Sequence, residues 1–130
     1  MVNFGLNITD IKASELINLV NTPMIILTEE KDSILLPHRI VCSYFPRTTN
    51  YSTSSSNLVF TLSGLVFGSL DASLLSLNTA SSSLINVSDC QNVINNKLIN
   101  QPLSLQNLGE NLADGDGNLK VFVWYSTVTF

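Results

Sequence analysis

The chain has 130 residues, of which 45% are hydrophobic and only 12% are charged, and its formal net charge is −4 at pH 7. Six Lys and Arg residues against ten Asp and Glu provide no basic stripe to neutralise phosphates, which argues against nucleic-acid binding. No apolar run reaches the roughly 18 residues of a transmembrane helix, and the first residues lack the features of a secretory signal. We therefore expect one domain over residues 1–130, with no membrane partner.

An apolar residue recurs about every second position near the N-terminus, which predicts a first strand or an extended N-terminal arm over residues 1–13. These apolar residues are Phe4, Leu6, Ile8 and Ile11. Residues 14–20 fit either one helical turn, which Ser14 could cap, or a short strand. The short apolar run 24–27, which follows Pro23, predicts another strand.

Residues 34–45 predict the clearest strand of the first half, because side chains alternate from His38 onward, and Pro37 predicts a kink or bulge in it. A polar loop follows over residues 46–57, and its Ser- and Thr-rich centre has no side chains expected in a core. Tyr51 is the aromatic ring expected to be exposed there. The candidate ligand-binding residues of this loop are Thr48, Asn50, Tyr51 and Ser52.

The middle of the chain carries weaker signals. Residues 57–64 predict a strand ended by a glycine, residues 71–77 fit a helical turn capped by Asp71 or a strand, and residues 102–105 predict a short strand. Short strands separated by turn residues predict an all-β fold. We expect an antiparallel β-sandwich, jelly-roll-like, or a compact β-barrel, with little helix.

The segment 114–118 consists of turn-forming residues and resembles the opening of a calcium loop. The twelfth position from Asp114 is Tyr125 rather than the glutamate that an EF-hand requires, so the motif is incomplete. A tight turn that uses glycines at positive φ explains the segment better than a metal site.

The last strand, residues 119–130, is apolar on both faces. Alternation puts Leu119, Val121, Val123 and Tyr125 on one face, and Lys120, Phe122, Trp124, Val128 and Phe130 on the other. One face can enter the core, and the second needs another sheet or a neighbouring subunit. The candidate core or interface residues are Phe122, Trp124, Val128 and Phe130.

No residue pattern assigns a catalytic, cofactor or metal site. His38 is the only histidine, so a histidine-based hydrolase or a histidine metal site would have to be built on it. Cys42 and Cys90 could pair only if the fold brings them together; an isolated strand cysteine is more often a small buried apolar residue. We therefore expect a protein that is not an enzyme.

The order of segments resembles that of small virion structural proteins of tailed bacteriophages. The resemblance is carried by the runs 11–23, 34–44 and 57–60, by Tyr51 and by the end of the chain, residues 114–125. It implies a virion subunit made in the host cytoplasm, most simply a capsid decoration (cement) protein that binds the major capsid protein on the outer surface. A tail or fibre component is the alternative that the resemblance also allows. Closed symmetry, a homotrimer being the simplest expectation, would hide the second face of the last strand.

The low charge leaves other functions open. Charged residues usually make up about 25% of a soluble domain. A surface this poor in charge fits a subunit whose surface is covered in an assembly, but it also fits a secreted or ordinary β-domain with an uncharged surface. A carbohydrate- or receptor-binding module that uses residues 48–56, and a small hydrolase built on His38, are the competing functions.

Overall fold

A computed structural model describes residues 2–28, 31–52, 56–62, 65–87 and 101–129. These residues form eight strands and two short helices. In chain order they are β1 (Val2–Ile11), helix α1 (Ala13–Leu16), β2 (Met24–Leu27), β3 (Ser33–Phe45), β4 (Leu58–Leu62), β5 (Leu65–Leu70), 3-10 helix η1 (Ala72–Ser76), β6 (Ser81–Ile85), β7 (Leu103–Asn107) and β8 (Asn118–Thr129). No helix in the described part of the chain is long and apolar enough to cross a membrane.

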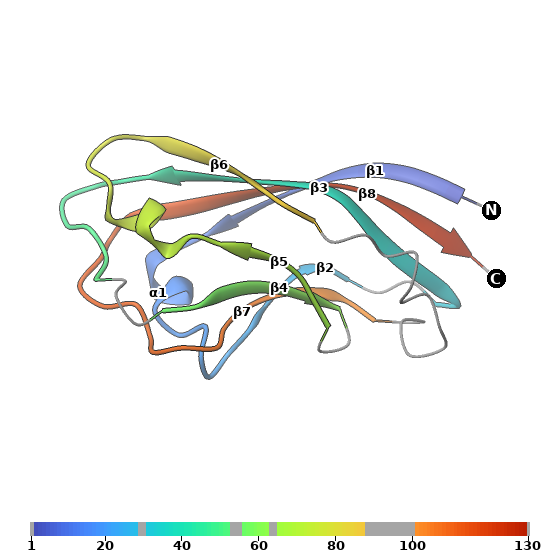
Figure 1. Cartoon of the computed structure of the whole chain (residues 1–130), viewed down its shortest axis with the longest axis horizontal. Helices are drawn as coiled ribbons and strands as arrows, with labels where there is room; N and C mark the ends of the chain where they lie inside the picture. The colour runs from blue at the N-terminus through green and yellow to red at the C-terminus, as the bar shows by residue number, and fades with distance from the viewer. Residues whose placement is uncertain (1, 29–30, 53–55, 63–64, 88–100, 130) are drawn as a thin grey trace.

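The strands pair in the pattern of a jelly roll. β1 pairs with β8, β2 with β7, β3 with β6 and β4 with β5, so the two halves of the chain run antiparallel like one long hairpin. Further pairing of β3 with β8 and of β4 with β7 rolls this hairpin into two four-stranded sheets, ordered β1-β8-β3-β6 and β2-β7-β4-β5. Figure 1 shows the sheets as two layers, with β1, β8, β3 and β6 above the other four strands. The predicted all-β sandwich is confirmed.

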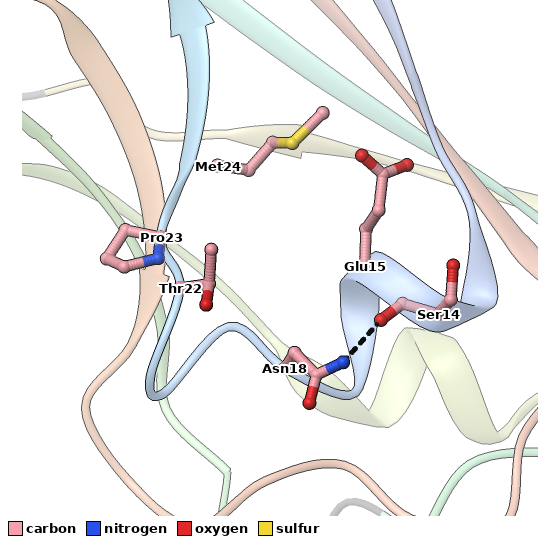
Figure 2. Close-up of a pocket in the computed structure, with 6 residues that line it drawn as sticks. All are labelled: Ser14, Glu15, Asn18, Thr22, Pro23 and Met24. Carbon is pink, nitrogen blue, oxygen red and sulfur yellow. Dashed lines mark hydrogen bonds between the residues drawn. The ribbon is translucent and has the colours of Figure 1, made fainter.

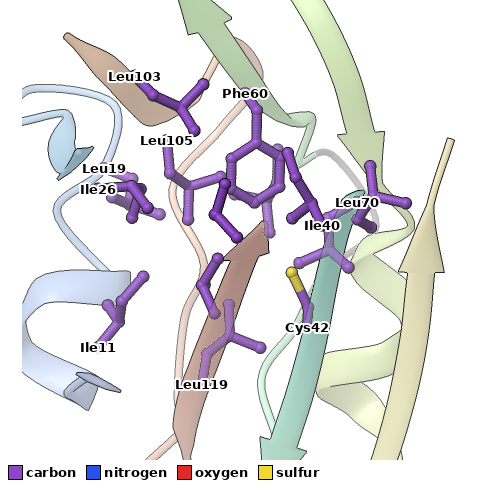
Figure 3. Close-up of a cluster of buried hydrophobic side chains, with 14 of the residues drawn as sticks. Ile11, Leu19, Ile26, Ile40, Cys42, Phe60, Leu70, Leu103, Leu105 and Leu119 are labelled. Carbon is purple, nitrogen blue, oxygen red and sulfur yellow. The ribbon is translucent and has the colours of Figure 1, made fainter. Parts of the chain in front are cut away.

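The core lies between the two sheets, where their inward-facing side chains meet (Figure 3). Ile40 and Leu119 from one sheet and Phe60 and Leu105 from the other are completely buried. Cys42 belongs to this cluster, and burial raises the pKa of its thiol to about 12. Its possible partner Cys90 lies outside the described residues, so the structure does not test the disulfide.

The last strand divides its faces as its alternation predicts. Leu119, Val121 and Val123 of β8 are completely buried, and Tyr125 on the same face is half-buried. The bulge expected in the strand with Pro37 is also confirmed, because the pairing of β3 with β8 shifts between Pro37 and Arg39.

Two local predictions concern helix caps. Of the two alternatives for residues 71–77, the structure shows the helical turn capped by Asp71, whose carboxylate accepts a hydrogen bond from the Ser73 N–H at 3.0 Å. The expected cap at Ser14 is wrong. Lys12 is the N-cap of α1, its N–H donates to Glu15 Oε1 at 3.0 Å, and Ser14 lies inside the helix.

Candidate functional site

Strand β1 turns its apolar side chains away from the core. Val2, Phe4, Leu6 and Ile8 are between 49% and 80% exposed, and Phe4 is the most exposed of them. Small or polar residues occupy the alternate positions up to Thr9, on the side of the strand that faces the second sheet. A strand of a sandwich ordinarily does the reverse and packs its apolar face on the core. β1 therefore has the pattern of a strand whose apolar face has a partner outside the domain.

Contacts on the inner side fix this orientation. Gly5 lies opposite Tyr125 of β8, and the Tyr125 ring covers it so closely that a Cβ at position 5 would be 2.8 Å from the ring. Asn7 donates through Nδ2 to the Ile26 carbonyl of β2 at 2.9 Å and to Thr9 Oγ1 at 2.8 Å. Slipping β1 by one residue would turn Asn7 outward and break these contacts. The exposed apolar row is thus a built feature of the sheet.

Neighbouring strands extend the row into a continuous surface. Leu6 lies opposite Trp124, and Trp124 lies opposite Arg39, whose Cζ is 5.4 Å from the centre of the indole ring. The Phe122 and Trp124 rings stack with their centres 6.3 Å apart. We call the following set the outer face. It comprises Val2, Phe4, Leu6, Ile8, Val41, Leu84, Phe122 and Trp124.

One charge, that of Arg39, lies within the outer face over the Trp124 ring, an arrangement common at protein–protein contacts, and other charges lie at its border. Asp10 and Lys120, at one end of the β1 and β8 pair, form an exposed ion pair at 3.6 Å. Lys120 Nζ also lies 6.0 Å from the centre of the Phe45 ring. No described element packs against this side of the sheet (Figure 1). An apolar centre with a polar border is the composition of a protein–protein contact surface.

His38 lies on this side of the sheet and has structural contacts. Its ring centre is 6.2 Å from that of Phe4, and its Nε2 is 2.7 Å from Ser126 Oγ. A serine beside a histidine is the arrangement of a nucleophile and its base. Ser126 is only 2% exposed, however, so a substrate cannot reach its hydroxyl.

The expectation that Tyr51 is an exposed ring on a polar loop is wrong. Tyr51 is only 3% exposed, and its hydroxyl donates to the Gly117 carbonyl at 2.6 Å. It also makes an edge contact with the buried Tyr44, with ring centres 6.3 Å apart. Burial, and then the nearby Tyr44 and Asp116, raise the pKa of Tyr51 to about 12. A single aromatic among serines and threonines has no periodicity, so no local pattern indicates that this loop contributes a side chain to the core.

The other candidate loop residues lie around this buried ring. Thr48 and Ser52 are exposed, whereas Asn50 is partly buried and accepts from the Tyr44 hydroxyl at 3.4 Å. Asp116 holds the loop, since its carboxylate accepts from the Thr49 N–H at 2.9 Å and from the Thr48 N–H at 3.0 Å. These hydrogen bonds lower the pKa of Asp116, and the bond from the Thr49 N–H has the largest effect. The described loop therefore presents no aromatic ring for a sugar.

The expectation that the turn before β8 uses glycines at positive φ is wrong. Its glycines instead allow neighbouring side chains to pack closely against the backbone. Asp114 is the residue with positive φ, at 66°. A Cβ on Gly115 would lie 2.2 Å from the Tyr51 ring, and one on Gly117 would lie 2.7 Å from the Tyr44 ring. The Asp116 carboxylate accepts hydrogen bonds from backbone N–H groups. No group of three or more potential metal ligands occurs among the described residues.

Two surface hollows are lined by residues that the structure describes. One, of about 220 Å³, lies between α1 and the start of β2 and is shown in Figure 2. The other, of about 430 Å³, lies between β5 and β6 and is open to solvent. The first is lined by Ser14, Glu15, Asn18, Thr22, Pro23 and Met24. Its one ionisable side chain is Glu15, which accepts from the Lys12 N–H at the start of α1, so the lining offers no nucleophile beside a base.

The structure brings part of the predicted interface together. Phe122 and Trp124 form the centre of the outer face, and Val128 is partly buried on the same side of β8. Phe130 lies outside the described residues. The alternation of apolar residues in β1 is visible in the sequence, but their place on an outer surface is not. Alternation alone does not tell which side of a strand meets the core.

Comparison with known proteins supplies no relative. No protein-family model matches the chain, and no curated protein or solved structure matches it. The functional inference is therefore carried by the chain's own residues.

Proposed function

We propose that this protein is a non-enzymatic structural subunit of a virus particle, which attaches to its neighbours through the outer face. The inverted pattern of β1 carries the proposal. Four apolar side chains in one row point away from the core, and one of them, Phe4, is 80% exposed. Scattered exposed apolar residues are normal on any protein, but a contiguous apolar surface marks an interaction site.

The physical benefit of covering this face is large compared with its cost. Apolar surface removed from water contributes about 25 cal/mol per Å². Pairing with β8 fixes the β1 backbone, and Phe122 and Trp124 already stack, so the backbone and these two rings lose little conformational freedom on binding. The low charge leaves little repulsion between copies packed close together on a particle.

The fold is compatible with this role. Jelly rolls of eight strands in two sheets occur in viral capsid domains, and they also occur in lectins and cupins. This is an argument from architecture alone, so the site has to carry the function. Within the proposal, a capsid decoration protein that contacts the major capsid protein is the first choice, and a tail or fibre component is the second.

The test is to purify virions that carry the wild-type chain or the variant Phe4→Ser/Trp124→Ser and to count copies per particle by mass spectrometry. We expect the chain in wild-type virions, at hundreds of copies for a capsid position or a few for a tail position, and a large loss with the double variant. Absence of the chain from wild-type particles would refute the proposal.

A control variant tests whether the loss is specific to the outer face. Leu108→Ser removes an apolar side chain that is 58% exposed but lies just beyond the end of β7, a strand of the other sheet. We expect this variant to enter particles at the wild-type level. If Leu108→Ser and the double variant were lost equally, the outer face would have no special part in attachment.

A further inference from the structure

The edge of β1 is left open in a way that sheet edges ordinarily are not. β1 is the terminal strand of its sheet, paired with β8 on one side from Val2 to Ile11 without a register shift. It contains no proline, and between Val2 and Thr9 it contains no charged residue. Long, regular, uncharged edges are templates for another strand, and proteins usually interrupt them with charges, prolines or bulges.

The other described edges of the sandwich are interrupted or short. β2 has four residues and a register shift, and Asn7 Nδ2 binds its Ile26 carbonyl. β5 has six residues and a register shift against β4, and β6 has five residues. Of the described edges, only β1 offers ten regular residues.

We infer that β1 pairs antiparallel with β1 of a second copy, about a two-fold axis at Gly5. This pairing extends the proposed function, and it rests on that proposal only where it treats the outer face as an interface. In this register Val2 lies opposite Ile8 of the other copy and Phe4 lies opposite Leu6, so each exposed apolar side chain meets another. The sheets of the two copies become one, and their outer faces join into one surface.

Self-pairing is favoured over a foreign strand by the symmetry of the β1 sequence. Its apolar residues stand two on each side of Gly5, and its small or polar residues Asn3 and Asn7 lie opposite each other in the same register. Asp10, the only charge in β1, lies outside the four apolar pairs and is already paired with Lys120 of its own chain.

The register predicts specific cross-links in the purified protein. Directly opposite residues of antiparallel strands have Cβ atoms about 4.5–5.5 Å apart, so paired cysteines can join after mild oxidation. With Cys90 replaced by Ser, a mixture of Phe4→Cys and Leu6→Cys chains should give a disulfide-linked dimer in high yield. The control mixture of Phe4→Cys with Leu84→Cys, on the opposite edge strand β6, should give little.

Sedimentation of the unmodified chain provides the second measurement. We expect a monomer–dimer equilibrium that Leu6→Lys, a charge placed on the edge, shifts at least tenfold toward monomer. Leu108→Ser, outside the outer face, should leave this equilibrium unchanged. A monomer at all concentrations, or equal cross-linking in both mixtures, would overturn the inference. If the dimer fails but Phe4→Ser/Trp124→Ser still prevents incorporation into virions, only the pairing is wrong. A dimer of a chain absent from virions would refute the function and leave the pairing intact.

Discussion

The ring of Tyr125 lies directly over Gly5, so that a Cβ at position 5 would be 2.8 Å from the ring carbon Cζ and from the hydroxyl oxygen. The two residues lie opposite each other in the β1 and β8 pair. Gly5 thus makes room for a large side chain that reaches inward from the neighbouring strand. This contact fits the observed register, in which the apolar side chains of β1 face outward.

Gly5→Ala should destabilise the domain by about 1–3 kcal/mol, because the added methyl group overpacks the site under Tyr125. Urea unfolding of the two proteins measures the difference. In the background Tyr125→Leu the same alanine should cost less, since the ring that it contacts is gone. Equal costs in both backgrounds would show that Gly5 and Tyr125 are not coupled.

Phe4→Ser should leave the free energy of unfolding of the monomer within about 0.5 kcal/mol of the wild-type value, because the ring is 80% exposed. Phe60→Ala is the contrasting variant. Its ring is completely buried between the sheets, and its loss should cost about 3–5 kcal/mol. Both values come from urea unfolding of dilute protein. A large destabilisation by Phe4→Ser would mean that the ring serves the fold rather than a partner.

Asp116→Ala should release the loop that contains Thr48 and Thr49, because both N–H groups lose their acceptor. The measurement is trypsin cleavage after the neighbouring Arg47, which we expect to be faster in the variant. Asp114→Asn is the control in the same turn, since asparagine tolerates the positive φ found there. Equal cleavage of wild type and Asp116→Ala would show that other contacts hold the loop.

The same carboxylate predicts a dependence on acid. Its pKa is lowered in the folded state, so the stability it contributes is present above its unfolded pKa of 3.8 and is lost as pH falls through the lower folded value. Urea midpoints measured from neutral to acidic pH should fall less steeply in Asp116→Ala than in the wild type. Parallel curves would contradict the assignment.

Stability should also decline at alkaline pH. The folded pKa of Tyr51 is raised from 10.0 to about 12, chiefly by burial, so its contribution is intact below pH 10 and is lost as pH rises through about 12. Cys42, raised from 9.0 to about 12, acts in the same direction from a lower starting pH. Tyr51→Phe should flatten the loss above pH 10, and tyrosinate absorbance locates the titration. An unchanged slope would show that Tyr51 ionises without cost in the folded protein.

Sequence alone determined the class of this fold and several local features. Alternation in β8 identified Leu119, Val121 and Val123 as one face, and Pro37 marked a kink or bulge. Each of these depends on a few neighbouring residues, and local stereochemistry is enough to decide them. The signals between residues 65 and 85 are too weak to predict β5 and β6. Residues 71–77 fit either a helical turn capped by Asp71 or a strand, and the structure decides for the helical turn η1.

Only the tertiary structure decided which side of β1 meets the core and whether Tyr51 is buried. A period of two divides a strand into faces but does not assign them, and here Tyr125 above Gly5 and the Asn7 bond to Ile26 make the choice. Tyr51 is buried because a turn more than sixty residues later supplies Gly115, which leaves space for its ring, and the Gly117 carbonyl, which accepts from its hydroxyl. Such contacts join residues that are distant along the chain, so no local pattern contains them.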